Sequence, residues 1–241
     1  MALVHEYITR LGGAERVLKR IADIYPEAPI YTLLYQAEKV SSHFPEDRVQ
    51  VSFLQSFPRF LRNRVKLLAP FCPSATESFN LSKYQLVLSS SNSFAKGVIT
   101  KPQTIHICYC HAPSTFVWDV FYAYREDQKP RGIMKFGIDI VAHYLRQWDR
   151  QAADRVDYFI ANSKTTQKRI KKFYRRDSEL IYPPVDVTRF TPTKDHEGFF
   201  LIVSQLTPYK RIDIAIEAFN KLQLPLVIIG DGSDRKRLER M

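Results

Sequence analysis

The feature that most constrains the fold is an alternation of short apolar runs with longer segments whose apolar residues recur at helical spacing. The apolar runs of the first part of the chain lie at 2–4, 28–34, 49–53, 84–89, 104–109, 158–161 and 180–182. Runs of this length predict buried strands, and the segments between them, such as 13–25 and 133–156, predict helices. Regular alternation of strand and helix implies a doubly wound parallel sheet of the α/β class with a Rossmann-like arrangement.

A second sheet begins near the end of the chain. Apolar runs at 199–203 and 226–229 are each followed by a helical pattern, and a polar, charged stretch at 194–198 precedes them. We therefore expect one domain over 1–193, a linker at 194–198 and the start of a second Rossmann-like domain over 199–241. Two strands with two helices cannot cover the faces of a sheet, so this part is expected to be poorly stable unless it docks on the first.

Composition limits the functions open to the chain. Its 241 residues carry a formal net charge of +11, with a pI of about 9.5. This favours an anionic partner, which is nucleic acid, an anionic membrane surface or a phosphorylated metabolite. The sequence has no zinc-finger spacing and no RNP-like aromatic strand, so no specific nucleic-acid motif supports the first option. Three cysteines without a C-x-x-C pair predict neither a disulfide framework nor a structural metal site.

The sequence favours a cytoplasmic protein that can be peripheral at the inner face of a membrane. Residues 1–13 lack the basic and apolar regions of a signal peptide, and no apolar run approaches the roughly 18 residues of a membrane span. Residues 57–68 predict a single amphipathic helix that carries Arg59, Arg62, Arg64 and Lys66. Such a helix can lie on an anionic membrane surface, or it can pack normally with a solvated basic face. Both interpretations stay open.

Polar residues and glycines follow the predicted strands of the first domain. They are His5 and Tyr7 after the first strand, Gly12 and Gly13 before the first helix, Asn92 after the serine run, and His111 and Trp118 after the fifth strand. Ligands of open α/β sheets bind at the carboxyl ends of strands, so these residues form the candidate site. Histidine can hydrogen-bond a ligand hydroxyl or transfer a proton, which makes His111 the candidate catalytic residue. Each residue also has a purely structural alternative. The glycines can form a tight turn, His111 can be hydrogen-bonded within the wall of the crevice without contacting a ligand, and Trp118 can belong to the core.

The second part has its own candidate ligand edge. Lys210 and Arg211 stand at the entrance of a helix that follows the strand predicted at 199–203. Free backbone N–H groups and the positive end of the helix dipole favour a phosphate there, and lysine adds a mobile charge suited to a diphosphate. The alternative is that both residues are solvated charges of the first turn. Gly230 follows the next strand, at the corresponding edge of the second sheet.

Several stretches, in order along the chain, resemble the family 4 glycosyltransferases of the GT-B fold. They are the glycine pair at 12–13, YCHAP at 109–113, YPPVDVTRFTP at 182–192, SQLTPYKRIDIAIEAF at 204–219 and the loop at 230–232. The resemblance implies that His111 contacts the donor sugar and that Lys210 binds the diphosphate of a nucleotide-sugar. It also implies that the glycine pair lies beside donor and acceptor. The chain departs from the family at Gln205, which stands where an arginine is usual, and at Asn92, where histidine is frequent.

The resemblance also implies the reaction. It suggests a retaining, mannosyltransferase-like enzyme that moves a sugar from a nucleotide-sugar, with GDP-mannose as one candidate, to a polysaccharide or lipid-linked acceptor. No metal or other cofactor is implied, because the nucleotide-sugar is the substrate. The paired-glutamate motif of the family would lie after residue 241, so the chain alone is expected to bind donor weakly and not to transfer sugar. The alternative is a non-catalytic basic module that docks on an anionic membrane or nucleic acid.

Overall fold

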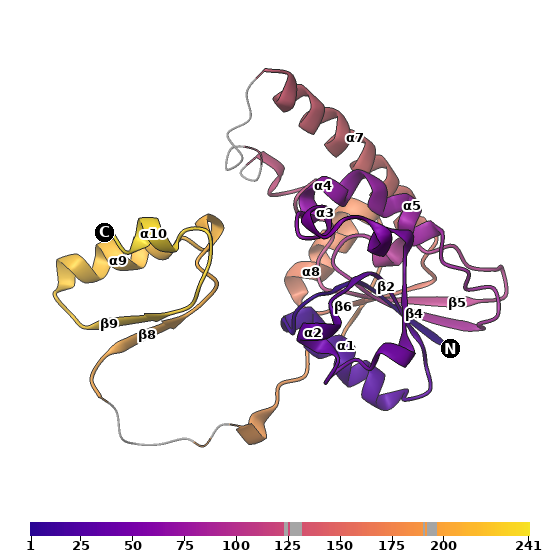
Figure 1. The fold of residues 1–241 in the computed structure, drawn as a ribbon, viewed down its shortest axis with the longest axis horizontal. Helices are drawn as coiled ribbons and strands as arrows, with labels where there is room; N and C mark the ends of the chain where they lie inside the picture. The colour runs from indigo at the N-terminus through magenta and orange to yellow at the C-terminus, as the bar shows by residue number, and fades with distance from the viewer. Residues whose placement is uncertain (123–124, 126–131, 190, 192–196) are drawn as a thin grey trace. The chain divides into compact units, whose positions relative to one another are not determined.

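The computed structural model describes residues 1–122, 125, 132–189, 191 and 197–241 (Figure 1). These residues form two compact units, Met1–Val185 and Asp186–Met241, each with its own parallel sheet. The division between the units precedes the linker predicted at 194–198, of which 194–196 lie outside the described residues. The domain limits 1–193 and 199–241 therefore stay predictions.

The first unit is built on a seven-stranded parallel sheet, which confirms the predicted α/β fold class. The strand order is β3-β2-β1-β4-β5-β6-β7. The strands are β1 (Ala2–Ile8), β2 (Ile30–Tyr35), β3 (Val49–Val51), β4 (Leu86–Ser91), β5 (Ile105–Cys110), β6 (Tyr158–Ala161) and β7 (Glu179–Leu180). Each corresponds to one of the apolar runs in the sequence. The sheet is doubly wound because the chain first builds outward from β1 to β3 and then crosses back to β4.

Helices cover both faces of this sheet, with α1 on one side and α5 and α7 on the other (Figure 1). The described helices of the unit are α1 (Gly13–Ile24), α2 (Ala37–Val40), α3 (Arg59–Arg62), α4 (Val65–Leu68), α5 (Cys72–Glu77), α7 (Ile133–Asp154) and α8 (Lys164–Arg169). Consecutive residues of β1 point to opposite cores, as the alternation of a strand requires. Leu3 packs with Leu18 of α1, whereas Val4 packs in the core that contains Cys72 of α5 and Ala142 of α7.

The single helix predicted over 57–68 is wrong. The segment forms two short helices, α3 and α4, and Arg64 between them leaves the helical conformation with φ −109° and ψ 61°. Asn63, a poor helix former, ends α3. The break lets Leu61 and Val65 pack against the core while Leu68 becomes fully buried in it. Burial of these apolar side chains in the core therefore stabilises the segment more than the hydrogen bonds of one continuous helix would.

The predicted helix at 164–174 also changes form along its length. The Ser163 hydroxyl caps α8 by accepting the Thr166 N–H at 3.2 Å, as expected for a serine at this position. After Arg169 the helix widens into a π turn over Ile170–Tyr174 and ends at Arg175, which has φ 55°. Both Ile170 and Tyr174 are fully buried, so the wider turn places two large side chains in the core.

The second unit has a small core. Its strands β8 (Phe200–Val203) and β9 (Leu226–Ile229) are parallel, and α9 (Ile212–Leu222) and α10 (Arg235–Leu238) follow them. Leu206, Ile212 and Leu238 are its buried apolar residues. In contrast, Val203 of β8 and Ile229 of β9 are 69% and 54% exposed, because two strands offer no third layer to cover them.

No helix in the described part of the chain is long and apolar enough to cross a bilayer.

Candidate functional site

The candidate site forms where the strand order of the first sheet reverses. β2 pairs with β1 on one side, whereas β4 pairs with β1 on the other. At such a switch point the connecting segments leave in opposite directions, and the crevice outside the strand ends binds ligands. His5 of β1 lies opposite Ser90 of β4, and Ser91 lies opposite Cys110 of β5, the residue before His111. The register thus brings together two histidines that are far apart in sequence.

His111 is joined to His5 through Ser90. The Ser90 hydroxyl lies 2.9 Å from His111 Nε2 and 3.2 Å from His5 Nδ1, and His5 Nδ1 donates to the Ser90 carbonyl oxygen at 2.8 Å. Because a carbonyl oxygen can only accept, Nδ1 of His5 carries a proton. The main chain of His111 is also held, since its N–H donates to the Ser91 carbonyl at 2.8 Å and the Thr166 hydroxyl donates to its carbonyl at 3.0 Å.

Glu15 extends these contacts to the glycine turn before α1. His5 Nε2 lies 3.8 Å from Glu15 Oε1, and Glu15 Oε2 accepts the Gly12 N–H at 2.9 Å. A Cβ at residue 12 would lie 2.6 Å from that same oxygen, so any side chain there would displace the carboxylate. A Cβ at Gly13 would meet nothing within 4 Å. We name this set of residues the histidine network: Gly12, Glu15, His5, Ser90 and His111.

Burial and neighbouring charges shift the pKa values of the two histidines in opposite directions. Burial lowers the pKa of His5, but the contact with the Glu15 carboxylate and the charges of Glu6 and Glu15 outweigh it, so this pKa is raised above 6.5. Burial and the charge of His5 lower the pKa of His111 to about 4. His111 is therefore a neutral imidazole at neutral pH. When the Ser90 hydroxyl donates to its Nε2, its Nδ1 carries the proton and can donate to a ligand hydroxyl.

Glu6 is a buried carboxylate that the sequence did not single out. Its Oε1 accepts hydrogen bonds from the Ser91 hydroxyl and from the backbone N–H groups of residues 92–95, at 2.7–3.1 Å. Burial raises the pKa of Glu6, but the charge of His5 and these hydrogen bonds hold it below its usual value. The carboxylate thus fixes the loop after β4 next to the histidine network. The only signal in the sequence is an acidic residue directly after His5, just beyond the apolar run at 2–4.

A second buried cluster surrounds Asp149 of α7. Its Oδ1 contacts the Lys96 ammonium and the Ser114 hydroxyl, and its Oδ2 accepts the Trp118 indole N–H at 2.7 Å and the Tyr174 hydroxyl at 2.8 Å. The side chains of Lys96 and Asp149 are each 2% exposed. The indole N–H, the only polar group of the Trp118 side chain, therefore fixes this residue to the buried cluster around Asp149. Sequence reasoning missed the ion pair, because one lysine in a loop and one aspartate in a helix give no sign of pairing.

Tyr7 and Asn92, two further predicted cleft residues, have partners outside the histidine network. The Tyr7 hydroxyl lies 3.1 Å from the Cys72 thiol of α5, and burial raises the pKa of this tyrosine well above 10. Asn92 is exposed, and its backbone N–H donates to Glu6 at 2.9 Å. The structure thus ties Tyr7 to a core helix and the main chain of Asn92 to Glu6 of β1.

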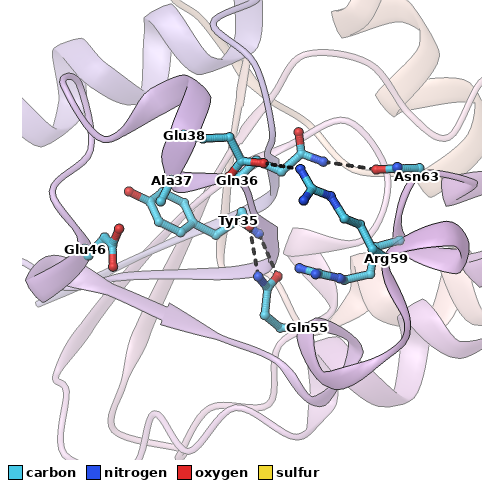
Figure 2. Close-up of a pocket in the computed structure, with 9 residues that line it drawn as sticks. Tyr35, Gln36, Ala37, Glu38, Glu46, Gln55, Arg59 and Asn63 are labelled. Carbon is cyan, nitrogen blue, oxygen red and sulfur yellow. Dashed lines mark hydrogen bonds and ion pairs between the residues drawn. The ribbon is translucent and has the colours of Figure 1, made fainter.

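A polar pocket of about 260 Å³ lies at the carboxyl end of β2, the strand next to β1 (Figure 2). The Gln55 side chain makes two hydrogen bonds to the main chain of Tyr35, at 3.0 and 2.9 Å. Arg59 pairs with Glu38 at 3.1 Å across the same pocket. Its remaining lining residues are Gln36, Ala37, Glu46, Arg62 and Asn63. Amide, guanidinium and carboxylate groups in one small cavity suit a ligand with several hydroxyl groups. We name it the β2 pocket.

In the second unit, the structure confirms the predicted strand, loop and helix around Lys210. Lys210 ends a short 3-10 turn, Pro208–Lys210, and α9 begins two residues later. It is exposed, and its ammonium lies 5.2 Å from the centre of the Tyr209 ring. Gln205 is exposed in the loop after β8. A Cβ at Gly230 would lie 1.8 Å from the Ser204 carbonyl oxygen, so this glycine lets the loops after β8 and β9 touch.

No group of three or more His, Cys, Asp or Glu side chains within the described ranges is placed to hold a metal ion.

The doubly wound sheet with its polar switch point, followed by a unit that opens with a second parallel strand pair, belongs to the GT-B class of α/β folds. The chain is a member of the family whose model is described as Glycosyltransferase Family 4, which matches residues 11–189. Residues 186–241 match the model described as Glycosyl transferases group 1.

One solved structure with the same fold is that of Alr3699/HepE from Anabaena in complex with UDP. It shares 15% sequence identity with this chain at a TM-score of 0.60, and the match covers 100% of this chain and 64% of that protein. This chain thus spans less than two thirds of the length of HepE. None of the curated proteins compared with the chain matches it.

Proposed function

We propose that the protein transfers a sugar from a nucleotide-sugar to an acceptor hydroxyl, with His111 contacting the donor sugar. The observation that carries this proposal is the 2.9 Å contact of His111 Nε2 with the Ser90 hydroxyl, inside a network at the switch point of the sheet. This contact fixes the orientation of the ring before a ligand arrives. A site that positions a sugar for transfer requires such preorganisation.

The neutral state of His111 defines its part in the reaction. With a pKa of about 4, the ring donates a hydrogen bond to a sugar hydroxyl without placing a positive charge beside it. In the retaining, metal-free reaction that the family resemblance suggests, the bond between the anomeric carbon and the diphosphate breaks, and the acceptor oxygen bonds to that carbon from the same face. A phosphate oxygen of the leaving diphosphate takes the proton of the acceptor hydroxyl. His111 is a positioning group in this scheme, and the stabilisation of the leaving diphosphate falls to basic groups.

Lys210 is the candidate diphosphate contact. It stands before the first turn of α9, where the positive end of the helix dipole adds to its own charge. The UDP in the HepE structure supports a nucleoside diphosphate as the donor's leaving group, and UDP-sugars and GDP-sugars, including GDP-mannose, are both candidates.

The β2 pocket is the candidate acceptor subsite. It lies on the strand next to β1, whose His5 belongs to the histidine network. Its mixture of amide, guanidinium and carboxylate groups is suited to sugar hydroxyls rather than to an apolar ligand. A polysaccharide end or a lipid-linked sugar fits this chemistry.

Because the chain alone is expected not to transfer sugar, the test is sugar transfer from UDP- and GDP-sugars by the protein fused to a complete domain of the Glycosyl transferases group 1 family, followed with the variants His111→Ala and His111→Gln. We expect His111→Ala to lower kcat/KM by about 100-fold or more, and His111→Gln to restore part of it because an amide still donates a hydrogen bond. His43→Ala is the matched control, since His43 lies outside the network. Full activity of His111→Ala, or equal losses in His111→Ala and His43→Ala, would contradict the proposal.

A further inference from the structure

The β2 pocket contains one positive side chain whose charge has no counterion. Arg59 and Glu38 neutralise each other across the pocket at 3.1 Å. Arg62 also lines the pocket and follows Arg59 on α3, but it makes no hydrogen bond and no ion pair with any residue that the structure describes. Its Nε is enclosed by the protein and still lacks an acceptor. The Arg62 guanidinium therefore keeps its full capacity to bind an anion in this pocket.

Two other arginines with an enclosed, unpaired Nε show why Arg62 is different. In Arg48 and Arg155 the same atom also lacks an acceptor. The guanidinium of Arg48 nevertheless donates to three backbone carbonyls, and that of Arg155 donates to the Glu77 carboxylate and to a backbone carbonyl. Contacts within the fold therefore fix both of these groups. The fold gives Arg62 no such acceptor, and this residue borders a polar pocket instead.

The pocket also contains a carboxylate without an ion pair in the described part of the chain, that of Glu46. Figure 2 shows the ring of Tyr35 between Glu46 and Arg59, so this carboxylate lies away from α3. Glu46 is exposed, and water and salt screen its charge, whereas Arg62 is half-buried. The unpaired charge that a ligand would feel most strongly is therefore the positive one.

We propose that the β2 pocket binds an anionic sugar and that Arg62 recognises its charged group, a carboxylate or a phosphate. The planar guanidinium suits either group, because it can donate two parallel hydrogen bonds to a pair of oxygens. The side-chain amides of Gln36, Gln55 and Asn63 line the same pocket and suit the neutral hydroxyl groups of the sugar ring. The inference rests on the proposed function, since it gives the candidate acceptor subsite a substrate class: an acidic sugar or a sugar phosphate.

The test is binding of small sugars to the chain in the absence of any donor, followed by the NMR signals of the three side-chain amides of the pocket. The probes are the methyl glycosides of glucose, galactose and mannose, with the corresponding uronates, 6-phosphates and 2-amino sugars. We expect a uronate or a 6-phosphate to bind about tenfold or more tightly than its neutral glycoside, as a charge-assisted hydrogen bond provides. The tighter of the two identifies the charged group. Equal binding of neutral and anionic sugars, or tightest binding of an amino sugar, would overturn the proposal.

Variants of two arginines test whether Arg62 provides the preference. Arg62→Gln should remove the preference for the anionic sugar, leave the binding of neutral glycosides unchanged and leave the amide spectrum outside the pocket intact. Arg62→Lys should keep only part of the preference, because a point charge replaces the planar fork. The matched control is Arg64→Gln, which removes the same charge from an exposed position that does not line the pocket. A preference that survives in Arg62→Gln, or that both glutamine variants lose equally, would overturn the proposal.

Ion controls and neutral sugars separate the remaining outcomes. If free phosphate and acetate bind as tightly as the 6-phosphates and uronates, the pocket is an ion site only, and the assignment of an anionic sugar is overturned. Binding of neutral glycosides without any preference for anionic ones would refute this inference alone and leave the acceptor subsite in place. The absence of all sugar binding at the pocket would refute the acceptor subsite as well. None of these results depends on sugar transfer, so the role proposed for His111 is tested separately.

Discussion

Removing the Asp149 carboxylate should destabilise the first unit more than any surface change. In Asp149→Ala, the Lys96 ammonium stays buried at 2% exposure without its counterion. The donors of Ser114, Trp118 and Tyr174 also lose their shared acceptor. Breaking one side of a buried ion pair costs about 3–5 kcal/mol. A native domain has about 5–15 kcal/mol of stability in all, so this loss is a large share of the total.

A second variant separates the cost of the unpaired charge from the cost of the lost side-chain volume. In the double variant Lys96→Met with Asp149→Leu, no uncompensated charge remains, and apolar groups of similar volume fill the site. Replacing a buried pair in this way is often close to neutral, so the double variant should recover at least about 2 kcal/mol of the loss. The exposed pair of Arg59 and Glu38, at 76% and 55%, provides the control, and Glu38→Gln should change stability by less than about 0.5 kcal/mol.

Urea unfolding followed by tryptophan fluorescence measures all three variants. Trp118 donates its indole N–H to Asp149, so its emission should also change in the native state of Asp149→Ala. A loss below about 1 kcal/mol in Asp149→Ala, no larger than that of Glu38→Gln, would show that the pair is solvated. No recovery in the double variant would show that the charge of Lys96 is not the source of the cost.

Three further predictions concern other sites. Burial lowers the pKa of His106 from 6.5 to about 4, so the native state binds fewer protons than the unfolded state in this window. The free energy of unfolding should therefore fall by up to about 3 kcal/mol as the pH drops from 6.5 to 4. In urea unfolding, the free energy of His106→Gln should depend less steeply on pH than that of the wild type, and an equal dependence would contradict the prediction. Gly230→Ala would place a Cβ 1.8 Å from a carbonyl oxygen, so it should destabilise the second unit and speed the exchange of its amide hydrogens. The control Gly137→Ala, whose Cβ would meet nothing within 4 Å, should leave that exchange unchanged, and equal effects of the two changes would contradict the prediction. In the protein fused to a complete second domain, Lys210→Ala should weaken UDP or GDP binding by about 1.5–3 kcal/mol in calorimetry. Lys221→Ala should leave the affinity unchanged, and an unaltered affinity in Lys210→Ala would reject the assignment.

Much of the fold could be predicted from the sequence because its signals are local. Each apolar run became a strand of the parallel sheet, since period and length report directly on burial. The helix entrance at Lys210 also followed from local pattern, because a strand, a loop and an apolar periodic segment occur there in order. The single helix predicted at 57–68 was wrong for the same reason. The periodicity was real, but the break at Asn63 serves a core whose other walls are distant in sequence.

The sequence by itself placed His111 after a strand and Gly12 before a helix, and proposed them with His5 as one site. It was wrong on the end of the first strand, because β1 continues to Ile8 and contains both His5 and Tyr7. Only the tertiary structure decided how they are connected. Ser90 bridges the two histidines from a position 85 residues after His5, and Glu6 holds a loop at a similar separation. Such contacts depend on the order and register of strands in the sheet. Local periodicity carries no information on either, because a strand pattern is the same whichever neighbour the strand pairs with.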